Sequence, residues 1–179
     1  MDGEQRNENE WREYTLRWDR VILFLAWPAA VIISGGVYIN YVKDLPHKMN
    51  DTIGALLAAF LLLMFAGMPL GLLINYYLYC KDKILKISVE GNDFYYGEES
   101  CPHCYSKSQI SKIYRCETNN FRNPWNGYTV FKICFRDGTS IRFPNLLISD
   151  TKLSEGLGVE TERKSTWYPY ITRDGGNGK

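Results

Sequence analysis

Two long apolar stretches dominate the first half of the chain: VILFLAWPAAVIISGGVYINYV at Val21–Val42 and TIGALLAAFLLLMFAGMPLGLLINYYLY at Thr52–Tyr79. Neither contains Asp, Glu, Lys, Arg or His. An α-helix rises about 1.5 Å per residue, so roughly 20 apolar residues cover a hydrocarbon core of about 30 Å. The sequence therefore predicts a transmembrane hairpin, with helices at 21–42 and 52–79 joined by the polar loop Lys43–Asp51.

The composition fits two segregated parts, one for lipid and one for water. The chain of 179 residues is 45% hydrophobic, yet its mean hydropathy is −0.28. A net charge of +1 provides no strong field that would attract nucleic acid. The only strongly polar residues inside the two stretches are Asn40 and Asn75. Because ion and proton paths need ionisable groups at depth, a channel or transporter is not expected.

The flanking Lys and Arg residues predict the orientation of the hairpin. Four Arg precede the first helix, two Lys lie in the loop and three Lys follow the second helix, which favours cytoplasmic termini. A cleaved signal peptide is not favoured, because its apolar region usually has only about 7–15 residues. In the segment 1–20, Trp11, Tyr14 and Trp18 share one helical face, which predicts either a short interfacial helix or a disordered start.

Residues 81–160 are predicted to form a β-rich domain. Leu85, Ile87 and Val89 alternate with polar residues, as in a strand with one buried face. The turn signal Gly91-Asn92 follows and predicts a hairpin. The segment Tyr105–Glu117 is compatible with either a helical turn or a strand.

A second predicted hairpin completes the β-rich domain. Tyr128–Phe135 alternates cleanly and leads through the turn signal Asp137-Gly138 to a strand that ends at Pro144. Asp150–Leu157 is predicted to be a short helix, capped by the residue before it or by Asp150 itself. The polar tail 161–179 is predicted to be partly disordered. Together with the hairpin, these elements predict an α+β protein.

Three stretches of the β-rich domain carry a resemblance to a known family: Ile84–Tyr96, Tyr105–Arg115 and Tyr128–Phe143. The second is similar to the family pattern W/Y-S-x-I-x-x-I, with two extra residues between Ser106 and Gln109. Preceded by a membrane hairpin, they resemble the bacterial pleckstrin-homology-like (PH-like) membrane proteins. The resemblance implies a small, bent antiparallel barrel or sandwich closed by a C-terminal helix.

The resemblance also implies a function without catalysis. PH-like membrane proteins of this design are similar to adaptors, which bind other proteins or copies of themselves close to the membrane. It thus implies an integral protein of a bacterial inner membrane, held by lipid contacts along its two helices, with no cofactor. A weaker hypothesis by analogy is that the chain is an immunity protein against a toxin that acts at the membrane.

The sharpest chemical motif is Cys101-Pro102-His103-Cys104. It is identical to the redox dithiol of Dsb-type thiol oxidases, which needs a CxxC pair at the start of a helix and a facing cis-proline loop. A membrane-tethered thiol-disulfide oxidoreductase using Cys101 and Cys104 is therefore one alternative. A zinc site of Cys101, His103, Cys104 and Cys116 is a second alternative. The plainest interpretation is a turn at Pro102 with two unreactive thiols.

Aromatic residues outside the predicted strands are candidates for contact with lipid or a partner. Trp125 lies in the loop Asn119–Gly127, and Trp167 and Tyr168 lie in the tail. A Trp in such a loop alternatively caps the core of the domain. No phosphate-binding glycine loop, HExxH or GxSxG motif occurs, so no other enzyme class is indicated.

Overall fold

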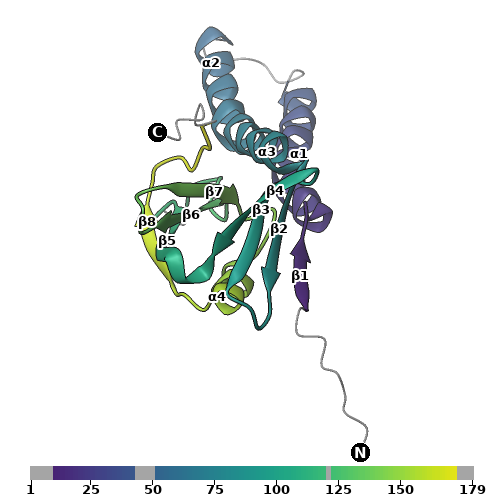
Figure 1. Cartoon of the computed structure of the whole chain (residues 1–179). Coiled ribbons are helices and arrows are strands. Elements are labelled where there is room, and N and C mark those ends of the chain that lie inside the picture. The colour runs from purple at the N-terminus through teal and green to yellow at the C-terminus, as the bar shows by residue number, and fades with distance from the viewer. Residues whose placement is uncertain (1–9, 43–50, 120–121, 173–179) are drawn as a thin grey trace, which may run out of the picture.

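The structure, a computed structural model, describes residues 10–42, 51–119 and 122–172. Figure 1 shows two β-sheets packed face to face, a short helix beside them, and a pair of long helices that project away from the sheets. The chain is thus α+β, with a helical hairpin, a β-sandwich and a short helix near its C-terminus, as the sequence predicts.

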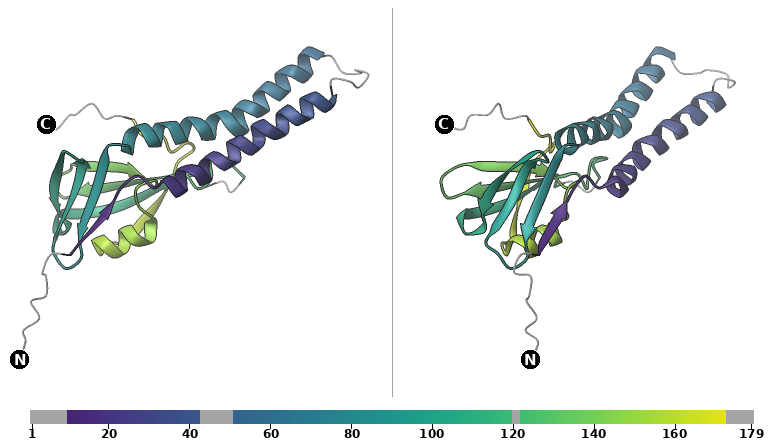
Figure 2. Two further views of the ribbon diagram at one scale, coloured as in Figure 1. Left: turned by 90° about the vertical axis from the view of Figure 1, so that its right-hand side faces the viewer. Right: turned by 45° about the vertical axis from the view of Figure 1, so that its right-hand side comes forward.

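The helical hairpin is built from α1 (Trp18–Val42), α2 (Asp51–Leu62) and α3 (Met68–Cys80). Between α2 and α3 lies one π-helical turn, Leu63–Gly67, in which the Met68 amide donates to the Leu63 carbonyl. Pro69 explains this interruption, because its ring crowds the preceding turn and it has no amide hydrogen to donate. Figure 2 shows the resulting bend between α2 and α3.

The first sheet shows that the hairpin is an insertion. Its strand order is β1-β2-β3-β4, with every neighbour antiparallel. The strands are β1 (Trp11–Tyr14), β2 (Lys83–Ser88), β3 (Asp93–Glu98) and β4 (Cys101–Ser106). For Trp11–Tyr14 both alternatives, a short interfacial helix and a disordered start, are therefore wrong, because these residues pair with a strand some seventy residues later. Along the chain, the helices α1 to α3 come between β1 and β2, although these two strands are direct neighbours in the sheet.

The second sheet has the order β7-β6-β5-β8. Its strands are β5 (Ile110–Glu117), β6 (Thr129–Phe135), β7 (Ser140–Pro144) and β8 (Thr161–Ser165). The hairpin of β6 and β7 turns at Asp137-Gly138, where Gly138 has φ +86° and the Asp137 carboxylate accepts hydrogen bonds from the Thr139 amide and hydroxyl. The tail is predicted to be partly disordered, but its first five residues form β8 because they pair in parallel with β5.

Helix α4 (Asp150–Leu157) has the bounds that the sequence predicts. The Ser149 side chain caps its N-terminus by accepting from the Lys152 amide. Its C-terminus is closed by Gly158, which adopts the left-handed conformation that favours glycine. Leu153 and Leu157 on its inner face are buried in the core.

The core of the sandwich extends into α3. Leu72, Leu73, Tyr76 and Cys80 are buried in the same cluster as the inner residues of both sheets, such as Phe131. The second apolar stretch was expected to lie in lipid along its whole length. Its last part instead packs against the β domain, because an apolar helix can be buried in a protein core as favourably as in lipid.

Candidate functional site

The CPHC motif lies on strand β4, at the edge of the first sheet. Side chains three positions apart in a strand point to opposite faces and lie about 10 Å apart along it, beyond the reach of a disulfide. Cys104 lies opposite Tyr95 on β3, and hydrogen bonding to this thiol raises the pKa of Tyr95. The described residues contain no cis peptide bond. The dithiol of a Dsb-type oxidase, with its helix and cis-proline, is therefore not formed here.

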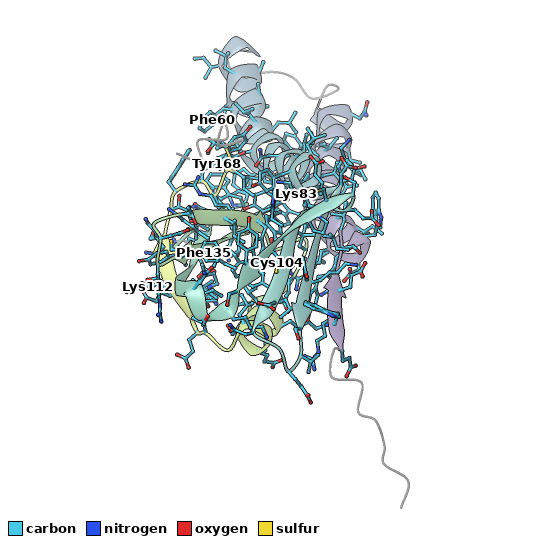
Figure 3. All side chains as sticks on the ribbon, viewed as in Figure 1. Phe60, Lys83, Cys104, Lys112, Phe135 and Tyr168 are labelled. Carbon is cyan, nitrogen blue, oxygen red and sulfur yellow. The ribbon has the colours of Figure 1, made fainter. Side chains whose placement is uncertain are left out.

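The predicted zinc ligands are also kept apart. Cys101, His103 and Cys104 belong to β4, whereas Cys116 belongs to β5 in the other sheet. Burial raises the pKa of Cys116, which favours the thiol over the thiolate that binds zinc. In the part of the chain that the structure describes, no three His, Cys, Asp or Glu residues lie close enough to hold a metal ion. Figure 3 shows Cys104 on the sheet that carries the motif.

Trp125 is part of the core, so its prediction as a contact residue is wrong. Only 1% of its surface is exposed. Its indole nitrogen donates a hydrogen bond of 2.8 Å to the carbonyl of Trp167, and its ring meets Trp167 and Tyr168 edge-on. The alternative that this Trp caps the core is the one that the structure favours.

The other two candidates lie on a segment that we name the C-terminal strap, residues 166–172. Trp167 is 67% exposed, so its side chain is accessible for contact. Tyr168 is half-buried, and its hydroxyl donates a hydrogen bond of 2.8 Å to the carbonyl of Met68. Tyr168 thus places the strap beside the first turn of α3 (Figure 3).

The C-terminal strap holds α3 through polar groups inside the apolar stretch. The Asn75 amide donates to the carbonyl of Ile171 and accepts from its amide, both at 3.0 Å. The buried hydroxyl of Tyr76 donates to the carbonyl of Pro169 at 2.7 Å. The signal in the sequence was Asn75 itself, a polar side chain in an apolar helix that needs a partner.

The base of α1 is fixed to the β domain as well. The Arg17 amide donates to the Leu146 carbonyl at 3.0 Å, and the Arg20 guanidinium donates to the Asn145 carbonyl. One turn further, the rings of Phe24 and Tyr128 stack with centroids 4.3 Å apart. Both arms of the hairpin are therefore attached to the sandwich at their bases.

Beyond these bases the hairpin is apolar and uncovered. By length and composition, Trp18–Tyr38 and Ile53–Cys80 are able to cross a membrane, and each contains an 18-residue window of high mean hydropathy, 2.0 in the first and 2.4 in the second. Only 6% of the first window is buried, and 22% of the second. Phe60 marks this exposed region on α2 (Figure 3). A core helix of a water-soluble protein would be mostly covered, so this surface is the main candidate for a functional contact.

The comparison with protein families agrees with this architecture. A family model described as the PH domain matches residues 13–155. The match begins within β1 and ends within α4, so it includes the inserted hairpin. No curated protein and no solved structure matches the chain. Because the family model covers most of its length, the chain belongs to the PH domain family.

Proposed function

We propose that this chain is an integral membrane protein whose hairpin crosses the bilayer twice and holds the PH domain against the membrane surface, where the domain binds other proteins. The observation that carries this proposal is the uncovered apolar surface of α1 and α2. Exposing so large an apolar surface to water is unfavourable by roughly 25 cal/mol for each Å². Contact with lipid removes this cost.

The attached bases of the helices set the depth at which the hairpin enters the bilayer. On α1 the contacts with the β domain reach Phe24, and on the second arm the C-terminal strap reaches Met68. The helical residues beyond these points, 25–42 and 51–67, extend about 27 Å and 26 Å at 1.5 Å per residue. Both lengths suit a hydrocarbon core of roughly 30 Å.

The insertion of the hairpin between β1 and β2 supports the proposal that both of its ends lie on the same side of the membrane. Because Trp11–Tyr14 pairs with β2, the segment before α1 and the domain after α3 lie at the same end of the helices (Figure 2). The flanking Lys and Arg residues favour the cytoplasmic side. A bacterial inner membrane remains the prediction that the family resemblance implies.

One face of the first sheet is the surface that we propose for partner binding. The rings of Trp11 and Tyr95 lie 5.2 Å apart across this sheet, and Tyr95 lies opposite the exposed Cys104. Exposed aromatic residues are enriched where proteins bind one another. This face is our candidate surface for a protein partner or a second copy of the chain, and the exposed Trp167 on the C-terminal strap is a separate candidate.

Membrane fractionation of the full chain tests the proposal. We expect the protein to stay with the membranes after washing at alkaline pH and to be released by detergent. Release by the alkaline wash would contradict insertion. The immunity role is a separate prediction: a strain that lacks the gene should become more sensitive to a toxin encoded nearby, and unchanged sensitivity would remove it.

A further inference from the structure

Large apolar side chains are exposed at two places on the β domain. Outside the helical hairpin, those exposed among the described residues are Trp11, Val89, Trp167 and Tyr170. Trp11 lies opposite Ser88, directly before Val89, at the end of β2. This strand of six residues leads away from α3, so the first pair lies about 20 Å from the hairpin (Figure 1). Trp167 and Tyr170, 67% and 54% exposed, lie instead on the C-terminal strap, which is bound to α3.

We propose that Trp167 and Tyr170 lie in the headgroup layer of the bilayer, so that the C-terminal strap is a third membrane contact beside the two helices. This inference rests on the proposed function, because insertion of the hairpin sets the depth of the strap. A contact outside the hairpin holds the PH domain at one angle to the membrane surface. It needs no charged headgroup, since neither ring carries a charge.

The contacts of the strap with α3 give its depth. The Tyr168 hydroxyl donates to the carbonyl of Met68, where the segment assigned to hydrocarbon ends, and Ile171 pairs with Asn75. Asn75 lies about 10 Å further along α3, at 1.5 Å per residue. The headgroup layer on each side of the hydrocarbon core is roughly 5–8 Å thick. The strap therefore starts at the edge of the hydrocarbon and runs through the headgroup layer.

The backbone of the strap is prepared for a surrounding poor in water. Irregular backbone beside hydrocarbon needs partners within the protein, because lipid tails form no hydrogen bonds. The strap carbonyls that accept such bonds are those of Trp167, Tyr168, Pro169 and Ile171. Their donors are the side chains of Trp125, Tyr76 and Asn75 and the backbone amide of Tyr170. A segment that stayed in water would not need this degree of internal bonding.

The exposed rings have the chemistry of the membrane boundary. Pro169 and Ile171 are buried, whereas Trp167 and Tyr170 point away from the domain. Each exposed ring combines an apolar body with one polar group, the indole N–H or the hydroxyl, which suits a layer between water and hydrocarbon. Trp and Tyr are the residues enriched at this level of membrane proteins. Because the strap lies against α3 at the membrane boundary, a protein partner would have to displace lipid to reach these rings.

Fluorescence quenching by brominated lipid tests this contact in the full chain. The protein is placed in phosphatidylcholine vesicles whose lipid carries bromine near the top of its acyl chains, and only nearby Trp residues are quenched. We expect Trp167→Phe to reduce the quenched part of the emission. Trp11→Phe removes the exposed Trp at the far end of β2 and is the matched control, which should leave the quenched part unchanged. Equal losses in the two variants, or no loss for Trp167→Phe, would overturn the inference.

A second experiment reads the depth at single positions. In a background where Trp125 is the only Trp left, a Trp is placed at position 167, by Tyr170→Trp or by Val89→Trp. We expect bromine near the headgroups to quench the first two reporters more strongly than bromine near the chain ends, and neither lipid to quench the reporter at position 89. Stronger quenching by the deep bromine at positions 167 and 170 would overturn the inference, as would no quenching there, which is the result for rings that face water or a protein. The first experiment changes one exposed ring per variant, so its outcome decides the question even if the second background does not fold.

The alkaline wash separates the failure of this inference from the failure of the proposed function. A chain that stays in washed membranes although Trp167 escapes quenching contradicts the strap as a membrane contact and leaves insertion standing. A chain released by the wash contradicts both.

Discussion

Asn75 on α3 and Ile171 in the C-terminal strap exchange two hydrogen bonds of 3.0 Å, although 96 positions separate them in the chain. The side-chain amide of Asn75 thus takes the place of a neighbouring strand for the backbone of Ile171. This pairing satisfies a polar group inside an apolar helix and attaches the end of the described chain to the second arm of the hairpin.

Replacing Asn75 should loosen the C-terminal strap. Asn75→Ala removes both bonds to Ile171, so we expect a loss of about 1–3 kcal/mol in stability and faster proteolysis within residues 166–172. Asn40→Ala is the matched control, because the Asn40 amide donates to the carbonyl of Gly36 on its own helix. Limited proteolysis in detergent measures the difference, and equal cleavage of the two variants would contradict the role of Asn75.

Trp125 and Trp167 should respond in opposite ways to truncation. Trp125→Ala empties a fully buried site and is expected to reduce stability by about 3–5 kcal/mol. Trp167→Ala removes a mostly exposed ring and should change stability far less, although it is the better candidate for weakening partner or lipid contact. Thermal unfolding of both variants in detergent checks this order, which similar losses of stability would refute.

Two buried tyrosines allow a test of the polar contacts in the core. The Tyr96 hydroxyl donates a hydrogen bond of 2.9 Å to the Arg142 carbonyl, whereas the buried Tyr128 hydroxyl has no partner among the described residues. Tyr96→Phe should therefore cost about 1 kcal/mol near neutral pH, and Tyr128→Phe should cost little. A larger loss for Tyr128→Phe in thermal unfolding would show that its hydroxyl is bonded in solution.

The same tyrosines predict a loss of stability in alkali. Burial raises the pKa of Tyr96 and of Tyr128 above the value of about 10 in the unfolded chain. The folded state therefore holds these protons more tightly, so their contribution to stability is complete below about pH 10 and falls as the pH rises further. Unfolding followed from pH 8 to 12 should show a smaller alkaline loss for Tyr128→Phe than for the parent chain. If the stability of the variant and of the parent chain falls equally steeply between pH 8 and 12, the titration of Tyr128 does not contribute to the alkaline loss.

The thiols of the CPHC motif should not form a disulfide with each other. Because Cys101 and Cys104 point to opposite faces of β4, mild oxidation is expected to leave no bond between them. The double substitution of both residues by Ser should leave folding intact. Peptide mass spectrometry after oxidation would reveal a bond between Cys101 and Cys104 if the strand were wrongly assigned.

Local patterns of sequence predicted those parts of the fold that depend on neighbouring residues. The hairpin at Asp137-Gly138 and the helix Asp150–Leu157 with its Ser149 cap follow from turn and capping chemistry, and both are confirmed. The α+β class follows from the same signals. In each of these elements the residues that decide the conformation lie within a few positions of one another.

Long-range pairing accounts for the parts that the sequence did not reveal. Trp11–Tyr14 is a strand only because β2 lies beside it, and its aromatic spacing equally suits a helix. The burial of α3 could not be predicted, because Leu and Tyr residues suit both lipid and a protein core. The CPHC motif was misleading because four matching residues do not carry the strand and helix that the redox chemistry requires.

Side-specific cysteine labelling of the full chain tests the central claim most directly. An impermeant thiol reagent is applied to sealed membrane vesicles of known orientation, using the exposed Cys101 and a His47→Cys substitution in the segment between α1 and α2. We expect Cys101 to react from one side of the membrane and position 47 only from the other. Reaction of both positions from the same side would contradict a hairpin that crosses the bilayer.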